Sequence, residues 1–186
     1  MVDKNKISTI THIRFDPSEP KWDNIGIEDI AHSLSMLTRA NGHFDTFFSV
    51  ARHSLNCAYE AKQRGFDCRV QLLCLLHDAA EAYIGDMTRP LKMKIPEFSE
   101  IEKKYQDIIF SKFISPEITE EERSKARLID DAMLYHEFLT FNGEELFDRA
   151  PDIKIDVTKG ISGFRETEKE FLDLFRTLED EIQQTE

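Results

Sequence analysis

The sequence predicts an all-α fold built as a single domain. Apolar residues recur at helical spacing through most of the chain, and capping residues, glycines and prolines separate the periodic segments. Strand content should be very small. The 186 residues, 40% of them hydrophobic, contain no repeat, low-complexity tract or linker, and the chain is long enough to bury one core. We therefore expect one helical bundle over residues 1–186.

Start and stop signals place the individual helices. Asn41 and Gly42 end the first helix, and Gly65 ends the second. Thr119 and Glu122 form a capping box that starts a long helix. The expected helices span residues 27–40, 45–64 (starting at Asp45 or Thr46), 67–83, 97–113, 119–141 and 162–183.

The N-terminal segment differs from the rest of the chain. Residues 1–26 are rich in turn-forming types, so we expect an irregular arm with room for one short strand within residues 6–15. A lone tryptophan is more often an anchor than a ligand platform. Trp22 is therefore expected to fix this arm to the helical body.

Charge and cysteine content narrow the function classes. The formal net charge of −12 argues against a duplex-binding surface and against anionic membranes, whereas a small anionic substrate stays compatible with it. The three cysteines, Cys57, Cys68 and Cys74, lack any CxxC spacing and are expected to be reduced thiols, with Cys57 and Cys74 buried. There is no apolar signal segment and no run of membrane-spanning length. We expect a cytoplasmic protein that binds neither nucleic acid nor membrane.

The segment from Val70 to Leu91 concentrates the chemistry of the chain. An apolar helical pattern leads into the adjacent pair His77 and Asp78, and Glu81 and Asp86 follow closely. Burying an imidazole and several carboxylates among leucines and alanines is costly unless something compensates them. A bound cation satisfies the carboxylates and fixes the imidazole tautomer at the same time.

Other helices supply the remaining candidate ligands. His53 follows Val50 by three residues and is expected on the core side of its helix. With His77, Asp78 and Asp130 it forms an H…HD…D set of two imidazoles and two carboxylates. Such a set suits one divalent ion, which we expect to be Mn²⁺, Co²⁺, Fe²⁺, Zn²⁺ or Mg²⁺. Helical periodicity does not distinguish Asp130 from Asp131.

The motifs around these residues resemble those of the HD-domain metal-dependent phosphohydrolases. SVARHSLNCAYEA resembles the first histidine motif of that family, and LLHDAAEAYIGDMTRPLK resembles its central motif. The latter is close to the branch with bacterial 5′-deoxyribonucleotidases. DIAHSLSMLTRANGHFDTFFSVARHS also resembles small phage and prophage members. The resemblance covers residues 27–140 and implies that His53, His77, Asp78 and Asp130 are the metal ligands.

The resemblance also implies roles for residues beside the ligands. Glu81 matches the acid that orients the attacking water, and Asp86 matches a second acid near that water. Arg39 matches the arginine that grips the substrate phosphate, and its planar fork suits phosphate oxygens. The deoxyribonucleotidases have a tryptophan next, where this chain has Ala40. Structural alternatives stay open: a salt bridge for Glu81, a turn cap for Asp86, and neutralisation of a helix C-terminus for Arg39.

The expected function is metal-dependent phosphate release from nucleoside 5′-monophosphates or related nucleotides. The alternatives are a phosphodiesterase or pyrophosphohydrolase acting on a longer phosphate chain, a non-catalytic nucleotide sensor, and a purely structural metal. No histidine lies between His77 and His136, which favours one metal over two. His136 is expected to be structural, whereas His32 and His43 either line the pocket or bond the backbone. A homodimer is compatible with the acidic amphipathic helices.

Overall fold

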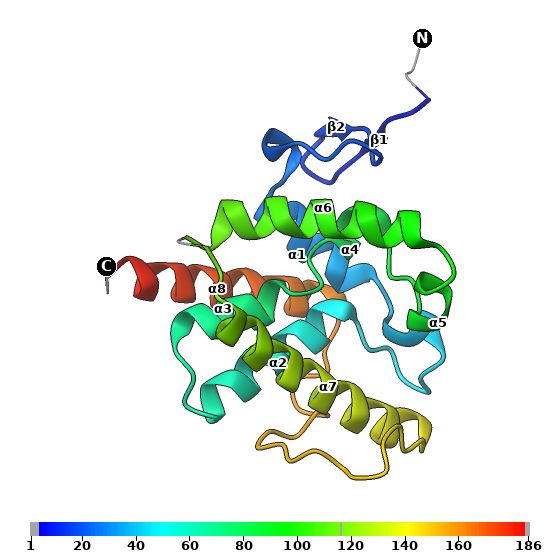
Figure 1. Ribbon diagram of the computed structural model, residues 1–186, viewed down its shortest axis with the longest axis vertical. Helices are drawn as coiled ribbons and strands as arrows, with labels where there is room; N and C mark the ends of the chain where they lie inside the picture. Colours follow the sequence, from blue (N-terminus) through cyan, green and yellow to red (C-terminus); the bar gives the residue numbers. More distant parts are fainter. Residues whose placement is uncertain (1–3, 116, 185–186) are drawn as a thin grey trace.

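The computed structural model describes residues 4–115 and 117–184, and it is all-α as predicted, apart from one small strand pair (Figure 1). Two antiparallel two-residue strands, with Ile7 opposite Phe15, belong to the N-terminal arm. The elements in chain order are β1 Ile7–Ser8, β2 Arg14–Phe15, η1 Trp22–Asn24, α1 Ile27–Met36, η2 Arg39–Gly42, α2 Val50–Gln63, α3 Cys68–Leu76, α4 Glu81–Ile84, α5 Arg89–Lys92, α6 Pro96–Phe113, α7 Glu120–Asn142 and α8 Phe164–Gln183.

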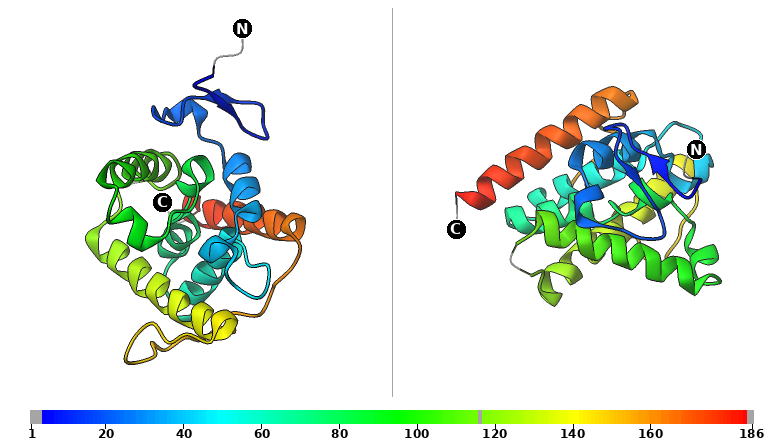
Figure 2. Two further views of the ribbon diagram at one scale, coloured as in Figure 1. Left: turned by 90° about the vertical axis from the view of Figure 1, so that its right-hand side faces the viewer. Right: turned by 90° about the horizontal axis from the view of Figure 1, so that it is seen from above.

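Helix α3 is the centre of the bundle. It contacts α2, α8, α7 and α6, so neighbours cover it on several sides (Figures 1 and 2). Its sequence explains this position, because its residues apart from Arg69 and Gln71 are Cys, Val or Leu, and a helix with apolar residues on most sides is buried. Leu72, Leu75 and Leu76 have no exposed surface. The C-terminal end of α3, which is followed by His77 and Asp78 (the HD pair), is therefore held firmly by the core.

Helix α7 runs across α2 and α3 and begins as the sequence predicts. The Thr119 hydroxyl accepts from the Glu122 N–H at 3.2 Å, and the Glu122 carboxylate accepts from the Thr119 N–H at 2.7 Å. Both halves of the capping box are thus present. Gly143 ends the helix in the left-handed region at φ 70°, which glycine adopts without strain. Ile129 and Met133 bury the inner face of α7 against the core.

The helix predicted over residues 67–83 is in fact broken at the HD pair. Helix α3 ends at Leu76, residues 77–80 form turns, and α4 begins only at Glu81. Gln106 from α6 satisfies backbone groups at this break, since its amide donates to the Leu76 carbonyl and accepts from the Ala80 N–H. A polar side chain from a distant helix thus replaces helical hydrogen bonds, which local periodicity does not reveal.

The first and second helices are both shorter than predicted. Helix α1 stops at Met36 rather than near Ala40, and α2 starts at Val50, where the Ser49 side chain caps it. Between them, the Arg39 N–H donates to the Phe48 carbonyl at 2.8 Å. Ala40 and Asn41 occupy the left-handed region at φ 53° and 51°, an unusual conformation for alanine.

An aromatic cluster holds this connecting segment in place. Phe44 and Phe48 pack against Phe141 near the end of α7, with ring centroids 5.5 and 4.9 Å apart, respectively. The three rings form a small hydrophobic cluster separate from the main core. The segment that carries Arg39 is therefore fixed between α2 and α7.

Several smaller expectations are settled by the structure. Trp22 contacts the helical body as expected, since the Lys112 Nζ atom of α6 lies 5.6 Å from its ring centroid, but its side chain is 48% exposed. The buried anchor of the arm is Phe15, which is 2% exposed and packs against Tyr83. The loop expected after Gly85 contains the short helix α5. Cys57 and Cys74 are buried free thiols as predicted. Among the described residues, no helix has both the length and the apolar character needed to cross a membrane.

The capping box gives a stability prediction. Thr119→Ala removes the oxygen that accepts from the Glu122 N–H, and we expect the free energy of unfolding to fall by about 1 kcal/mol. Urea denaturation followed by circular dichroism measures this change. Thr119→Ser keeps the acceptor and should stay close to the parent chain; an equal loss in both variants would contradict a capping role.

Candidate metal centre

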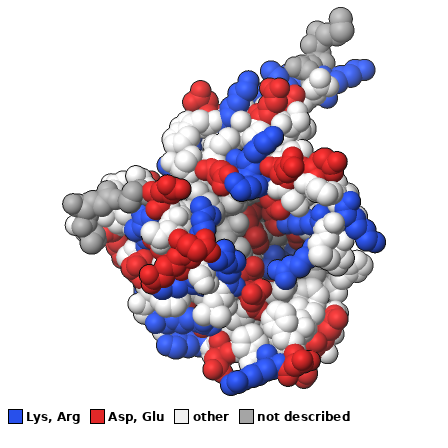
Figure 3. All heavy atoms as spheres, viewed as in Figure 1, with Lys and Arg blue, Asp and Glu red and all other residues white. Residues whose placement is uncertain are grey.

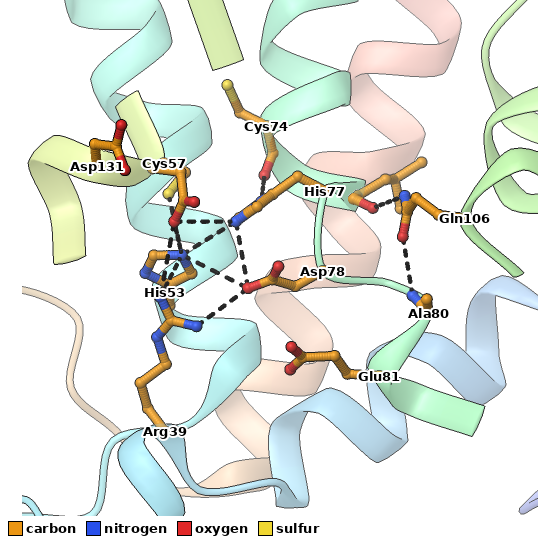
Figure 4. Close-up of polar contacts among 12 residues, drawn as sticks. Arg39, His53, Cys57, Cys74, His77, Asp78, Ala80, Glu81, Gln106 and Asp131 are labelled. Atoms are coloured by element: carbon orange, nitrogen blue, oxygen red, sulfur yellow. Dashed lines mark hydrogen bonds and ion pairs between the residues drawn. The ribbon is translucent and has the colours of Figure 1, made fainter. Parts of the chain in front are cut away.

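Four side chains from three parts of the fold converge at one point. His53 comes from α2, His77 and Asp78 from the turn after α3, and Asp130 from α7. The His53 Nε2 atom lies 3.1 Å from the His77 Nε2 atom and 3.2 Å from the Asp130 Oδ1 atom. The Asp78 Oδ2 atom lies 3.3 Å from the His77 Nε2 atom (Figure 4). The structure thus brings the predicted H…HD…D set together.

Hydrogen bonds on the outer side of each imidazole fix its orientation. The His53 Nδ1 atom lies 2.7 Å from the Glu137 Oε1 atom, and the His77 Nδ1 atom lies 2.7 Å from the Cys74 carbonyl oxygen. Because both partners are acceptors, each Nδ1 carries the hydrogen and donates it. In the neutral rings both Nε2 lone pairs then point into the cluster, as is typical of metal-ligating histidines.

The spacing of these atoms fits a single ion. Two nitrogen or oxygen ligands held about 2.1 Å from one metal at about 90–110° lie about 3.0–3.5 Å apart. Three of the five separations between these ligand atoms fall within this range. The other two, 3.6 Å from the His77 Nε2 atom to the Asp130 Oδ1 atom and 3.8 Å from the His53 Nε2 atom to the Asp78 Oδ2 atom, correspond to wider angles at the ion. Two imidazole nitrogens and two carboxylates form a donor set that divalent transition ions accept. The residues present therefore fit a divalent metal.

The electrostatics of the cluster also favour a cation. Burial opposes the charge on His77, but Asp78 and hydrogen bonds to Asp130 and Asp78 raise its pKa well above the usual value. Burial and Arg39 oppose the charge on His53, yet Glu137 and Asp130 raise its pKa. The pKa values of Asp78 and Asp130 are lowered despite burial, chiefly by the neighbouring histidines. The carboxylates thus stay ionised and attract positive charge.

Arg39 borders the cluster instead of ending a helix. Its guanidinium lies 3.2 Å from the Asp78 Oδ2 atom, 3.4 Å from the Glu137 Oε2 atom and 3.7 Å from the Asp130 Oδ1 atom. It also lies 3.1 Å from the His53 Nε2 atom. Glu137, Asp78 and Asp130 outweigh the effect of burial and raise the Arg39 pKa. The helix-end interpretation of Arg39 is therefore wrong.

Glu137 is the site residue that the sequence reasoning missed. Its side chain is completely buried, with one oxygen on His53 and the other facing Arg39. It therefore connects a candidate metal ligand to the candidate phosphate-binding residue. Glu137 follows Asp130 by seven residues, which places both on one face of a helix. An acid at this spacing on a largely apolar face was the available signal.

Glu81 is buried beside the cluster, whereas Asp86 is more distant. Figure 4 shows the Glu81 carboxylate next to Asp78, on the same side as Arg39. Its Oε2 atom is buried without a hydrogen-bond partner, and its Oε1 atom lies 3.7 Å from the Lys92 Nζ atom. Burial, Asp78 and Asp86 raise the Glu81 pKa well above its usual value. Within the described residues, no hydrogen bond or ion pair joins Asp86 to the cluster.

The two neighbouring aspartates of α7 have different surroundings. Asp130 points into the cluster, whereas the Asp131 side chain is 53% exposed and lies 3.9 Å from Arg89. In Figure 4 Asp131 lies apart from the cluster, and no dashed line joins it to the other residues drawn. The geometry thus favours Asp130 as the ligand and makes Asp131 a suitable control position.

The remaining four histidines lie elsewhere, and His12 is an exposed residue of the N-terminal arm. His32 pairs with Glu168 at 3.1 Å, and His43 is exposed at the end of η2. His136 binds the Pro151 carbonyl at 2.7 Å, as a structural histidine does. None of the four lines the cavity described next.

A cavity of about 460 Å³ opens beside the cluster. His77, Asp78, Glu81 and Asp130 line its inner part. Figure 3 shows a hollow on this face with acidic side chains at depth and basic side chains around it. The basic residues that line the cavity are Arg89, Lys92, Lys103, Arg123 and Arg127.

Metal binding should weaken as the pH falls. The pKa values of His53 and His77 are raised, so protons compete with the ion for the Nε2 lone pairs up to a higher pH than in free histidine. For each protonated ring, the dissociation constant for Mn²⁺ should rise about tenfold per pH unit below the raised pKa. Calorimetric titration across the neutral range measures it. A pH-independent constant would contradict imidazole ligation.

Comparison with known proteins agrees with this geometry. The model of the HD domain family matches residues 38–138, which include all the cluster residues described above. An uncharacterized protein of Escherichia coli K12, YfdR, is 37% identical over 113 residues, 60% of each chain. An uncharacterized Rhodobacter capsulatus protein, RCAP_rcc00048, is 36% identical over 110 residues, 56% of each chain. The matches thus span somewhat more than half of both relatives. The chain belongs to the HD-domain family, the metal-dependent phosphohydrolases that its motifs resemble.

Proposed function

We propose that this protein hydrolyses phosphate monoesters of nucleotides, with nucleoside 5′-monophosphates as the first substrate class to test. The observation that carries the proposal is the position of Arg39. Its guanidinium adjoins three of the four candidate ligands, at 3.2 Å from Asp78, 3.1 Å from His53 and 3.7 Å from Asp130. A phosphate-binding group next to a divalent-ion site is the minimal arrangement for metal-assisted phosphate release.

The ion would be held by His53, His77, Asp78 and Asp130. When bound, it would act as a Lewis acid on a phosphoryl oxygen and lower the pKa of water. Glu137 contributes by keeping His53 in one tautomer and orientation. The Cys74 carbonyl does the same for His77.

Arg39 would bind and orient the phosphate. Its planar guanidinium has parallel N–H groups that match two phosphate oxygens. In the structure its Nη atoms face Asp78 and His53, so a phosphate would replace these contacts. Glu137 faces the Nε side, so the carboxylate limits rotation of the guanidinium. Ala40 follows where deoxyribonucleotidases have a tryptophan, so we propose that both ribose and deoxyribose substrates are accepted.

Glu81 would handle the proton of the attacking water. Its carboxyl group has a raised pKa and one buried oxygen without a hydrogen-bond partner among the described residues. A carboxyl group with a raised pKa is a better base than an ordinary glutamate, and the oxygen without a partner offers a position to bind water. Asp86 raises the Glu81 pKa through its charge, which gives it a supporting role without direct contact.

A second candidate substrate class carries a longer phosphate chain. Arg89, Lys92, Lys103, Arg123 and Arg127 line the same cavity as His77 and Asp78. A volume of about 460 Å³ and this basic lining suit nucleoside di- or triphosphates as well as monophosphates. The substrate panel below separates these possibilities.

Phosphate release from nucleoside mono-, di- and triphosphates tests the proposal. The metal-stripped protein is resupplied with Mn²⁺, Co²⁺, Mg²⁺ or Zn²⁺. We expect turnover that depends on the metal. In Asp130→Asn, kcat/KM should fall by more than 100-fold, because loss of an outer-sphere partner of a metal ligand already costs roughly 10- to 100-fold. Asp131→Asn is the matched control and should stay near the parent value, because Asp131 points to solvent.

Two outcomes would contradict the proposal. If no nucleotide releases phosphate with any metal but one raises the melting temperature of the loaded protein, the chain is a nucleotide sensor. If Asp130→Asn and Asp131→Asn lose the same activity, Asp130 has no special role in binding the ion.

A further inference from the structure

A thiol lies inside the candidate metal centre. Cys57 follows His53 by four residues on α2, so both side chains lie on one face of the helix. The Cys57 Sγ atom is 3.6 Å from the His53 Nε2 atom. The ligand atoms of Cys57, His53 and His77 all lie within 4.8 Å of one another. The cysteine is only 1% exposed.

The position of the sulfur fits coordination of the same ion. A metal about 2.1 Å from an imidazole nitrogen and about 2.3 Å from a sulfur, at a near-tetrahedral angle, separates the two donors by about 3.6 Å. This is the separation that the structure gives between Cys57 and His53. The other buried cysteine near the site differs: Figure 4 shows the Cys74 sulfur directed away from the cluster.

We propose that the Cys57 sulfur is a further ligand of this ion and that it biases the centre towards Zn²⁺, Co²⁺ or Fe²⁺ over Mg²⁺. Thiolates prefer these softer ions, whereas imidazole and carboxylate accept a broader range. Coordination replaces the S–H bond by a sulfur–metal bond and releases the proton to solvent. The inference rests on the proposed divalent-ion site. The experiment below distinguishes failure of the ion site from failure of Cys57 as a ligand.

The surroundings of Cys57 support a role beyond packing. A structural cysteine normally lies among apolar groups, where it behaves as a small inert hydrophobe. Cys57 is part of the buried core, but its sulfur also lies 3.6 Å from the His53 Nε2 atom, on the side of the candidate ligands. A buried thiolate is stable next to a cation, and a coordinating ion supplies that charge.

Optical spectroscopy of the cobalt-loaded protein tests the proposal. With one equivalent of Co²⁺ we expect visible ligand-field bands together with a sulfur-to-cobalt charge-transfer band in the near ultraviolet. Cys57→Ser should lose the charge-transfer band and keep the visible bands. Cys74→Ser is the matched control and should keep both. Zn²⁺ affinity should fall in Cys57→Ser by more than the roughly 10- to 100-fold that loss of an outer-sphere partner costs, with Mg²⁺ affinity unchanged.

The outcomes separate the two claims. Visible bands without a charge-transfer band in the parent protein would overturn Cys57 as a ligand and leave the metal site standing. The absence of any cobalt bands or of stoichiometric binding would remove the metal site and the thiol ligand together. X-ray absorption on the unmodified protein needs no variant: a sulfur neighbour at about 2.3 Å from the metal is expected, and only nitrogen and oxygen neighbours would refute the proposal.

Discussion

The site depends on one constraint: two imidazole nitrogens with lone pairs face each other and are surrounded by carboxylates. The Nε2 atoms of His53 and His77 lie 3.1 Å apart, and acceptors on the outer side of each ring turn both of them inwards. Such an arrangement of electron-rich atoms is unfavourable without positive charge between or beside them. Arg39 supplies part of that charge, and a divalent ion fits the donor spacing.

The fold meets this constraint by bringing rigid elements together. Helix α3 is fixed by apolar contacts on several sides. Gln106 forms hydrogen bonds with the backbone of Leu76 and Ala80, on either side of the turn that contains His77 and Asp78. Helix α7 contributes both Asp130 and Glu137. The aromatic cluster of Phe44, Phe48 and Phe141 ties the segment bearing Arg39 to the end of the same helix. Ligand positions and the candidate phosphate-binding group are thus connected through α7.

Much of this architecture follows from the sequence, and the failures have physical reasons. Periodicity and the capping box at Thr119 predict the long helices, because these signals are local. The break after Leu76 depends on Gln106, thirty residues away. The early end of α1 goes with the backbone bond from the Arg39 N–H to the Phe48 carbonyl, which local periodicity does not reveal either. Glu137 was missed because its partner His53 lies in another helix. The wrong helix boundaries and the missed Glu137 therefore depend on residues distant in the sequence, whereas the His77–Asp78 motif could be identified from the sequence alone.

The central claim is that one divalent ion sits where His53, His77, Asp78 and Asp130 meet. A crystal of the protein loaded with Mn²⁺ or Co²⁺, with diffraction data collected on either side of the metal's absorption edge, tests it most directly. The account predicts one anomalous peak within bonding distance of both Nε2 atoms and of carboxylate oxygens from both aspartates. A peak elsewhere, or no peak from a stoichiometrically loaded crystal, would contradict it.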